Sequence, residues 1–355
     1  TLTGSQQRVL KEIAADIAQP HPMLRLLQGD VGSGKTVVAA AVALRAVDIG
    51  AQAALMAPTE LLAEQHYRNF HDWLQPLGIE VAWLTKRLTG RARRTLLDRL
   101  AAGEIHVVVG THALFQETVA FAKLALAIVD EQHRFGVHQR LALREKGRQC
   151  GYCPHQLIMT ATPIPRTLAM SAYADLDTST LDELPPGRQS VKTVVVPDHR
   201  RDAVIERIRQ ACRSGQQAYW VCPLIEESEA LQYQAAAVTI EHLTEILPEL
   251  RIGLAHGRLS ATSKEAAMAA FKAGDLDLLV ATTVIEVGVD VPNASLMIIE
   301  NAERLGLAQL HQLRGRVGRG TVASHCVLLY RPPLSVVARA RLAVLRECND
   351  GFEIA

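Results

Sequence analysis

The residues best suited to chemistry form a short glycine-rich segment near the amino terminus. Residues 29–36 read G-D-V-G-S-G-K-T, with an apolar run before them and a helix-forming run after them. In this context glycines let backbone N–H groups converge on phosphates at a helix amino terminus. Lys35 is placed to reach the β- and γ-phosphates, and the Thr36 hydroxyl to ligate Mg²⁺. We therefore expect a nucleotide site made by Gly29, Asp30, Gly32, Ser33, Gly34, Lys35 and Thr36.

A pair of carboxylates follows another apolar run. Residues 126–129 predict a buried strand, and Asp130 and Glu131 come directly after it. Parallel α/β sheets gather their functional groups at the carboxyl ends of strands. Asp130 could hold Mg²⁺ through water, and Glu131 could orient or deprotonate the attacking water, as phosphoryl transfer requires. Alone, such a pair more often caps a helix, but the upstream glycine-rich segment favours the catalytic interpretation.

Short β-rich apolar runs alternate with helix-forming stretches, which predicts an α/β fold whose mostly parallel sheets are flanked by helices. In the first half we expect strands at 24–28, 53–57, 106–110, 126–129 and 156–160. The Leu-Pro-Pro-Gly segment at 184–187 suits neither a helix nor a central strand, and predicts an interdomain linker. Strands are then expected at 191–196, 217–222, 251–254, 278–281, 296–300 and 324–329. The two halves thus repeat one architecture.

The composition narrows the class of protein. A chain of 355 residues with 48% hydrophobic and 21% charged residues has room for two globular domains. Lys plus Arg total 38 against 37 for Asp plus Glu, so any nucleic-acid-binding surface must be local. There is no signal-peptide pattern, and the apolar runs are shorter than the roughly 20 residues that cross a bilayer. We expect a soluble, cytoplasmic protein.

The cysteines do not indicate a disulfide framework. Six of them are scattered through a large chain, which favours a reducing compartment. Cys150 and Cys153 form a C-x-x-C pair, but His155 alone does not complete a four-coordinate zinc site. We interpret the pair as two thiols in a loop, with a metal or redox role as the alternative.

The motifs, in this order and spacing, resemble those of the superfamily 2 helicases across essentially all 355 residues. The matching segments are 2–6 (Q motif), 29–36 (Walker A), 57–66 (motif Ia), 110–114 (a strand-contacting segment), 130–133 (motif II), 160–167 (motif III), 281–290 (motif V) and 312–319 (motif VI). The resemblance implies two tandem RecA-like P-loop domains, at 1–187 and 188–345, with 346–355 starting a further C-terminal segment.

The same resemblance implies roles for individual residues. Gln6 would read adenine, and Gly288 and Asp290 of motif V would join the nucleotide site. Arg316 and Arg319, three apart at a helix start, would be arginine fingers that reach the phosphate when the domains close. Without the other motifs, we would interpret them as a solvated basic turn. Contacts to DNA phosphates, which carry no sequence readout, are implied for Thr59, Thr111, His112, Arg166 and Thr283.

The particular residues within these motifs are similar to those of two groups within the superfamily. These are the bacterial branched-DNA translocases and the transcription-repair coupling translocases. Gln132 with His133, together with residues 31–34, favours the first group. Membership would imply ATP- and Mg²⁺-dependent movement on double-stranded or branched DNA, remodelling stalled forks and Holliday junctions in recombination and repair at the bacterial nucleoid. These proteins add an N-terminal wedge domain and a C-terminal segment. Neither is complete here, and both ends of the chain look cut.

Other functions stay open at this stage. A nucleotide-gated DNA-binding module with vestigial hydrolysis is one, although intact Lys35, Glu131, Arg316 and Arg319 argue against it. A transcription-repair-coupling-type duplex translocase is another, but it would need a polymerase-binding domain.

A basic cluster on an expected helix and its lead-in also has two interpretations, direct DNA contact or a solvated helix face. Its members are Lys86, Arg87, Arg91, Arg93, Arg94 and Arg99. Aromatic residues make up only 4% of the chain, which argues against base-stacking platforms.

Overall fold

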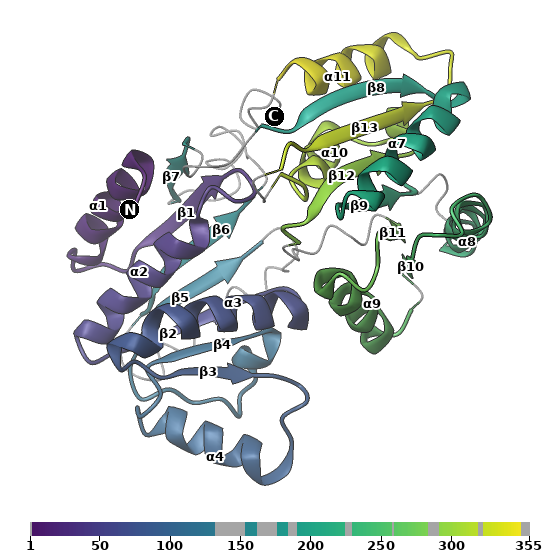
Figure 1. The fold of residues 1–355 in the computed structure, drawn as a ribbon. Coiled ribbons are helices and arrows are strands. Elements are labelled where there is room, and N and C mark those ends of the chain that lie inside the picture. Colours follow the sequence, from purple (N-terminus) through teal and green to yellow (C-terminus); the bar gives the residue numbers. More distant parts are fainter. Residues whose placement is uncertain are drawn as a thin grey trace. The chain divides into compact units, whose positions relative to one another are not determined.

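The chain, seen in a computed structural model, forms two compact units, residues 1–185 and 186–355 (Figure 1). The structure describes residues 2–131, 153–161, 176–183, 190–223, 229–257, 259–282, 291–318 and 322–348. Each unit holds one parallel sheet with helices packed against it. The expected linker at 184–187 lies outside the described residues, and the domain boundary at residue 187 stays a prediction.

The first unit is built on a seven-stranded sheet of order β3-β4-β2-β5-β6-β1-β7. Its strands are β1 (Leu24–Gly29), β2 (Gln52–Met56), β3 (Val81–Leu84), β4 (Val107–Gly110), β5 (Leu124–Asp130), β6 (His155–Thr160) and β7 (Asp177–Leu181). Every paired strand runs parallel to its neighbour. The central strands are buried on both faces, which explains why their sequences are continuous apolar runs rather than alternating ones.

Two strands of this sheet were missing from the sequence prediction. β3 has only four residues, so it offers little pattern to recognise. β7 reads D-T-S-T-L and is mostly polar. It lies at the sheet edge beside β1, where only Ser179 and Leu181 are buried. A polar edge strand needs a neighbour to supply its hydrogen bonds, and that neighbour is known only from the tertiary structure.

The first described helix of the first unit precedes β1, and the next three follow β1, β2 and β3 as βα units. They are α1 (Gly4–Ile17), α2 (Lys35–Asp48), α3 (Glu60–Leu74) and α4 (Gly90–Ala101), with short 3₁₀ turns η1 (Gln75–Leu77) and η2 (His112–Phe115). α3 begins where the Thr59 hydroxyl accepts a hydrogen bond from Leu62 N–H (3.3 Å). Its buried stripe is Leu62, His66, Phe70 and Leu74, spaced four residues apart. One member of that apolar stripe is therefore a histidine.

The second unit carries a six-stranded parallel sheet of order β10-β11-β9-β12-β13-β8. Its strands are β8 (Lys192–Pro197), β9 (Gln217–Val221), β10 (Ile252–Ala255), β11 (Leu278–Ala281), β12 (Ala294–Ile299) and β13 (His325–Tyr330). Its helices are α7 (Arg201–Arg213), α8 (Glu229–Ile246), α9 (Ala261–Ala273), α10 (Leu307–Arg314) and α11 (Val336–Glu347), with 3₁₀ turns η4 (Asp198–Arg200) and η6 (Ala302–Arg304). Trp220 of β9 is fully buried at the centre of the core.

The two sheets share one topology. The order β3-β4-β2-β5-β6-β1 corresponds strand for strand to β10-β11-β9-β12-β13-β8, and β7 is an addition to the first sheet. β12 therefore corresponds to β5, and β8 corresponds to β1. The expected repetition of architecture is present in the described strands.

Candidate functional site

The glycine-rich loop connects β1 to α2 at the carboxyl edge of the first sheet. Gly32 and Gly34 have φ angles of +79° and +92°, which residues with a Cβ rarely adopt. Gly34 is the N-cap of α2 and has no side chain to occupy the helix end. The first N–H groups of α2 and the positive end of its dipole are thus available to a phosphate group.

Gly29 is required for a steric reason. A Cβ at this position would lie 2.5 Å from Ser33 Oγ and 3.2 Å from the main-chain oxygen of Leu181 in β7. The loop therefore closes tightly against the edge strand. Ser33 is buried, and its hydroxyl has no hydrogen-bond partner within the described part of the chain.

The side chain of Lys35 folds back over the loop. Its ammonium group donates to the main-chain oxygens of Gly29 (2.6 Å) and Asp30 (2.9 Å). Thr36, the next residue in α2, is half-buried. The positive charge of Lys35 is thereby held at the mouth of the glycine-rich loop, where the sequence analysis expected it.

Gln6 joins α1 directly to this loop. Its amide nitrogen donates to the main-chain oxygen of Ser33 (3.0 Å), and its amide oxygen accepts from Thr3 N–H (3.0 Å). A Cβ on Gly34 would collide with the same amide group. Gln6 is 4% exposed, so its contact with the loop is fixed by packing as well as by hydrogen bonds. Its expected role toward adenine stays a prediction.

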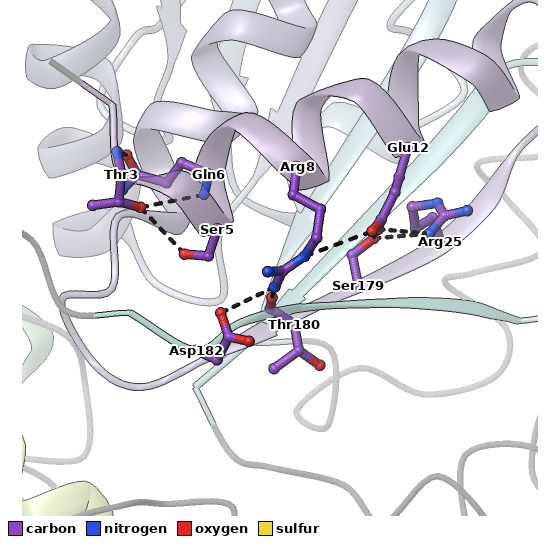
Figure 2. A network of polar contacts seen from close by, with 9 residues as sticks. All are labelled: Thr3, Ser5, Gln6, Arg8, Glu12, Arg25, Ser179, Thr180 and Asp182. Atoms are coloured by element: carbon purple, nitrogen blue, oxygen red, sulfur yellow. Dashed lines mark hydrogen bonds and ion pairs between the residues drawn. The ribbon is translucent and has the colours of Figure 1, made fainter.

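A polar network anchors α1 to β1 and to the edge strand β7 (Figure 2). Arg25 of β1 is buried, and it donates to Asp16 of α1 (2.5 Å) and to Ser179 of β7 (2.8 Å). Arg8 of α1 donates to the main-chain oxygen of Thr180 (2.9 Å). The helix that carries Gln6 is therefore held against the sheet by these hydrogen bonds as well.

Asp130 ends β5 close to the glycine-rich loop, and its partner is His66 of α3. Oδ2 of the carboxylate lies 2.7 Å from Nε2 of His66, and both residues are buried. Burial would raise the pKa of Asp130, but the hydrogen bond and charge of His66, with the charge of Lys35, hold that pKa below its ordinary value. Asp130 is therefore an anion at neutral pH, as a cation ligand must be.

The backbone turns sharply just after Asp130. Glu131 has a φ angle of +51°, in the left-handed region that non-glycine residues seldom enter, and its N–H donates to the main-chain oxygen of Met159 (2.9 Å). Such strained residues concentrate at functional sites. The turn therefore marks the end of β5, where the two neighbouring carboxylates lie, as a candidate site.

These residues fit a Mg²⁺–nucleotide. The loop offers main-chain N–H groups and Lys35 to phosphates, while Thr36 and Asp130 offer the oxygen ligands that Mg²⁺ prefers. The unsatisfied Ser33 hydroxyl lies in the same loop.

The carboxyl edge of the second sheet carries no such loop at the corresponding place. β8 is followed by η4 and α7 without a glycine, and Arg201 pairs there with Glu300, which follows β12 (Nη2 to Oε1 2.9 Å). Asn301, like Glu131, has a positive φ (+46°). An internal ion pair thus lies where the first sheet offers Lys35 and Asp130, so the nucleotide-binding features belong to the first unit.

Three of the expected DNA-contacting residues lie at the same sheet edge as the glycine-rich loop. Thr59 follows β2 and caps α3, while Thr111 and His112 follow β4. His112 is exposed, but Thr111 is 2% exposed and its hydroxyl donates to Glu60 Oε1 at 3.5 Å. A contact from Thr111 would have to use its main chain or act through Glu60. All three roles stay predictions.

Known proteins match the chain along most of its length. A family model described as DEAD/DEAH box helicase matches residues 3–171, and one described as helicase conserved C-terminal domain matches residues 200–321. The ATP-dependent DNA helicase RecG of Escherichia coli (strain K12) is 68% identical over 99% of this chain and 51% of its own length. The protein of that name from Bacillus subtilis (strain 168) is 49% identical over 100% of this chain and 51% of its own length.

Solved structures agree. The structure of RecG bound to a three-way DNA junction matches with a TM-score of 0.86 and 45% identity, covering 100% of this chain and 46% of that one. The chain matches the helicase portion of the RecG proteins along its whole length. The structure of S. cerevisiae Dbp5 bound to RNA and ADP BeF3 shares the fold, with 14% identity and a TM-score of 0.69, in a match that covers 100% of this chain and 92% of Dbp5. The predicted fold class, two tandem RecA-like domains, is confirmed.

The chain spans about half the length of the curated RecG relatives that it matches. Their family is the branched-DNA group that Gln132 and His133 favoured in the sequence. None of the helices in the described ranges is long and apolar enough to cross a membrane.

Motif VI differs from the expected geometry in one respect. Arg316 does not lie at a helix start. α10 ends at Arg314, and Arg316 is in the turn that follows, because the chain leaves the helix at Gly315 and Gly318 takes a φ of +81°. Arg316 is 4% exposed. Arg314 is also buried, and it donates to the main-chain oxygens of Leu345 and Cys348 at the end of α11.

Several expected site residues lie outside the described ranges, so their roles stay predictions. They are Arg166, Thr283, Gly288, Asp290 and Arg319. Cys150 is outside as well, while Cys153 is a half-buried free thiol. No cluster of metal-ligating side chains occurs among the residues that the structure does describe.

His66 is the site residue that sequence reasoning missed, although it ends the segment recognised as motif Ia. It occupies a buried position on an otherwise apolar helix stripe. A polar side chain at such a position needs a hydrogen-bond partner, and this was the available signal. The partner could not be named, because Asp130 is 64 residues away in sequence.

Proposed function

We propose that this protein is an ATP-dependent DNA helicase or translocase that acts on branched DNA, remodelling stalled replication forks and Holliday junctions in recombination and repair. The observation that carries the proposal is 68% identity to E. coli RecG across 99% of the chain, with the nucleotide-binding features intact. The relative whose structure holds a three-way DNA junction supports branched DNA as the substrate.

In the proposed mechanism the first unit binds ATP and positions the attacking water. The N–H groups of the glycine-rich loop and Lys35 bind the β- and γ-phosphates, and Gln6 holds the loop and meets adenine. Mg²⁺ held by Thr36 and Asp130 would neutralise charge on the phosphates. Glu131, turned away from the strand direction by its φ of +51°, orients the water or accepts its proton.

Movement would come from the second unit. Arg316 and Arg319 reach the transferring phosphate when the domains close, with Gly288 and Asp290 completing the nucleotide site. Domain closure and hydrolysis then become one event. Thr59, Thr111, His112, Arg166 and Thr283 would hold the DNA phosphates during this cycle.

We assign residues 1–187 and 188–345 to the two motor domains and 346–355 to the start of a C-terminal segment. A wedge domain and the rest of that segment would lie in the half of the relatives' length that this chain does not span. The protein would work in the bacterial cytoplasm, at the nucleoid.

The test is the ATPase rate of the chain without DNA, with linear duplex and with forked DNA. We expect hydrolysis that rises with DNA, and more with forks. Lys35→Ala should abolish hydrolysis with the fold retained, because Lys35 is half-buried and its ammonium group donates to loop carbonyls rather than packing in the apolar core. Wild-type turnover in that variant would refute the site.

The arginine-finger role has a separate test. Arg316→Ala should leave ATP binding nearly unchanged and lower turnover by about 10³ or more. Equal losses of binding and turnover would make Arg316 a ground-state ligand instead. ATP binding that changes DNA affinity without any hydrolysis would favour the nucleotide-gated module. Stimulation by linear duplex equal to that by forks would favour a duplex translocase of the transcription-repair coupling type.

A further inference from the structure

A group of cations lies beside the expected DNA-contacting residues without belonging to any helicase motif. Lys86 is in the loop after β3, and Arg91 and Arg94 are in the first turns of α4. All three side chains are exposed. We call these three residues the α4 strip.

The sheet register places this strip at the edge that holds Thr59 and Thr111. Leu84, the last residue of β3, pairs with Gly110 of β4, which in turn pairs with Met56 of β2. Three adjacent parallel strands thus end at the same level, and the loops after them lie side by side. Two interstrand spacings cover about 10 Å, which corresponds to roughly three nucleotides of one DNA strand along the helix axis.

Glu60 ties these loops together. Its Oε1 accepts from the main-chain N–H of Lys86 (3.3 Å) and from the Thr111 hydroxyl (3.5 Å), and Glu60 itself is the first residue of α3. One carboxylate therefore connects the segments that follow β2, β3 and β4. The position of Lys86 is set by the same residue that contacts Thr111, so the strip is continuous with the expected DNA contacts.

The charges along α4 are distributed unevenly. Near its carboxyl end Arg99 is neutralised by two acids, since it donates to both carboxylate oxygens of Glu80 (3.0 and 2.6 Å) and to Glu104 (3.0 Å). No ion pair forms at Lys86, Arg91 or Arg94 within the described ranges. The described structure thus leaves three positive charges uncompensated at one end of the helix and compensates the one at the other end.

Helix stability does not account for this arrangement. Cations are unfavourable in the first turn of a helix, where the dipole is positive, yet Arg91 is the second residue of α4 and the first turn has no acidic residue. The N-cap Thr89 makes no side-chain hydrogen bond there. The nearest acid on the exposed face, Asp98, lies one turn beyond Arg94. A polyanion bound across this end would relieve the repulsion.

We propose that the α4 strip binds backbone phosphates of the duplex on which the protein moves, extending the DNA contacts of Thr59 and His112 toward the β3 edge of the sheet. The inference rests on the proposed function. Exposed, uncompensated cations suit phosphate contacts that are independent of base sequence. The near-neutral chain as a whole (net charge +1) makes such a local patch necessary.

The test is a salt titration of DNA binding by the chain. Binding is measured by fluorescence anisotropy with a labelled duplex and with a labelled fork. The test variant is Lys86→Ala/Arg91→Ala/Arg94→Ala. The matched control, Lys11→Ala/Arg45→Ala/Arg99→Ala, removes the same charge from the same unit. A second variant, Arg91→Lys/Arg94→Lys, keeps the charge. Circular dichroism checks that each variant is folded.

Each lost phosphate contact should lower the slope of log K against log salt by about 0.9, so we expect a decrease of about 2.7 for the test variant. At 50 mM salt this corresponds to roughly tenfold weaker binding per contact. The control and the lysine variant should retain the wild-type slope. A wild-type slope in the test variant, or an equal decrease of slope in the control, would overturn the proposed role of the α4 strip and leave the proposed function standing. Absence of salt-dependent DNA binding by the wild-type chain would overturn the proposed function with it.

Discussion

The hydrogen bond between His66 and Asp130 supports a quantitative prediction. His66→Leu fills the same buried space but removes the donor, whereas His66→Gln keeps an amide that can donate to the carboxylate. The Asp130 carboxylate is 8% exposed and lies 2.7 Å from Nε2 of His66. Breaking a buried charged pair costs about 3–5 kcal/mol. Asp130 can instead take up a proton. At pH 7, protonating a carboxyl of ordinary pKa costs about 4 kcal/mol, which sets an upper limit on the loss of folding free energy.

We therefore expect His66→Leu to be about 3 kcal/mol less stable than His66→Gln in the first unit. For a domain of this size the difference corresponds to a Tm lowered by roughly 6–12 °C. The assay is scanning calorimetry at pH 7 in EDTA, read on the transition of the first unit. Because the same carboxylate is the proposed Mg²⁺ ligand, His66→Leu should also need more Mg²⁺ to bind a fluorescent ADP analogue.

Two results would refute this reasoning. If the Leu and Gln variants melt together, the hydrogen bond contributes nothing beyond filling space. If they differ in Tm but require the same Mg²⁺ concentration, His66 supports the fold and does not position Asp130 for a cation. If Mg²⁺–ADP raises the Tm of the first unit equally in both variants, this would likewise show that His66 does not position Asp130 for a cation.

Three further predictions concern single residues. Gly34→Ala should weaken nucleotide binding by at least about tenfold in calorimetric titration, because αL backbone costs roughly 1–2 kcal/mol with a Cβ and that Cβ would displace Gln6; unchanged affinity would mean that the loop adapts. The hydrogen bond from Arg251 holds the pKa of Asp277 below its ordinary value. The ionised Asp277 therefore stabilises the folded second unit fully above about pH 4, and this stabilisation is lost as the pH falls further. Asp277→Asn should therefore make the Tm of the second unit fall less as the pH is lowered below about 4. A pH profile identical to that of the wild type would show that the Arg251–Asp277 hydrogen bond does not contribute to the acid dependence. Burial raises the pKa of the Cys212 thiol to about 12, so it should react with Ellman's reagent at pH 8 only on unfolding, as mapped by mass spectrometry; rapid labelling of the native protein would show that the site opens.

Features that depend on neighbouring residues in sequence could be predicted from the chain alone. The glycine-rich loop is a contiguous segment, so residues 29–36 were sufficient to predict a turn between β1 and the start of α2. Strands buried on both faces are continuous apolar runs, and those in the described ranges were found within one or two residues of their observed ends. Asp130 and Glu131 were located because such a run ends at them.

What joins distant segments was decided only by the tertiary structure. β7 is a strand because β1 supplies its hydrogen bonds, and its polar sequence gives no apolar pattern. His66 became a site residue because α3 packs beside the end of β5, a contact that no local pattern encodes. Lys86 is continuous with Thr111 through Glu60 for the same reason. Local spacing specifies the groups that bind a phosphate, whereas the long-range packing of strands and helices specifies which partner holds each group in place.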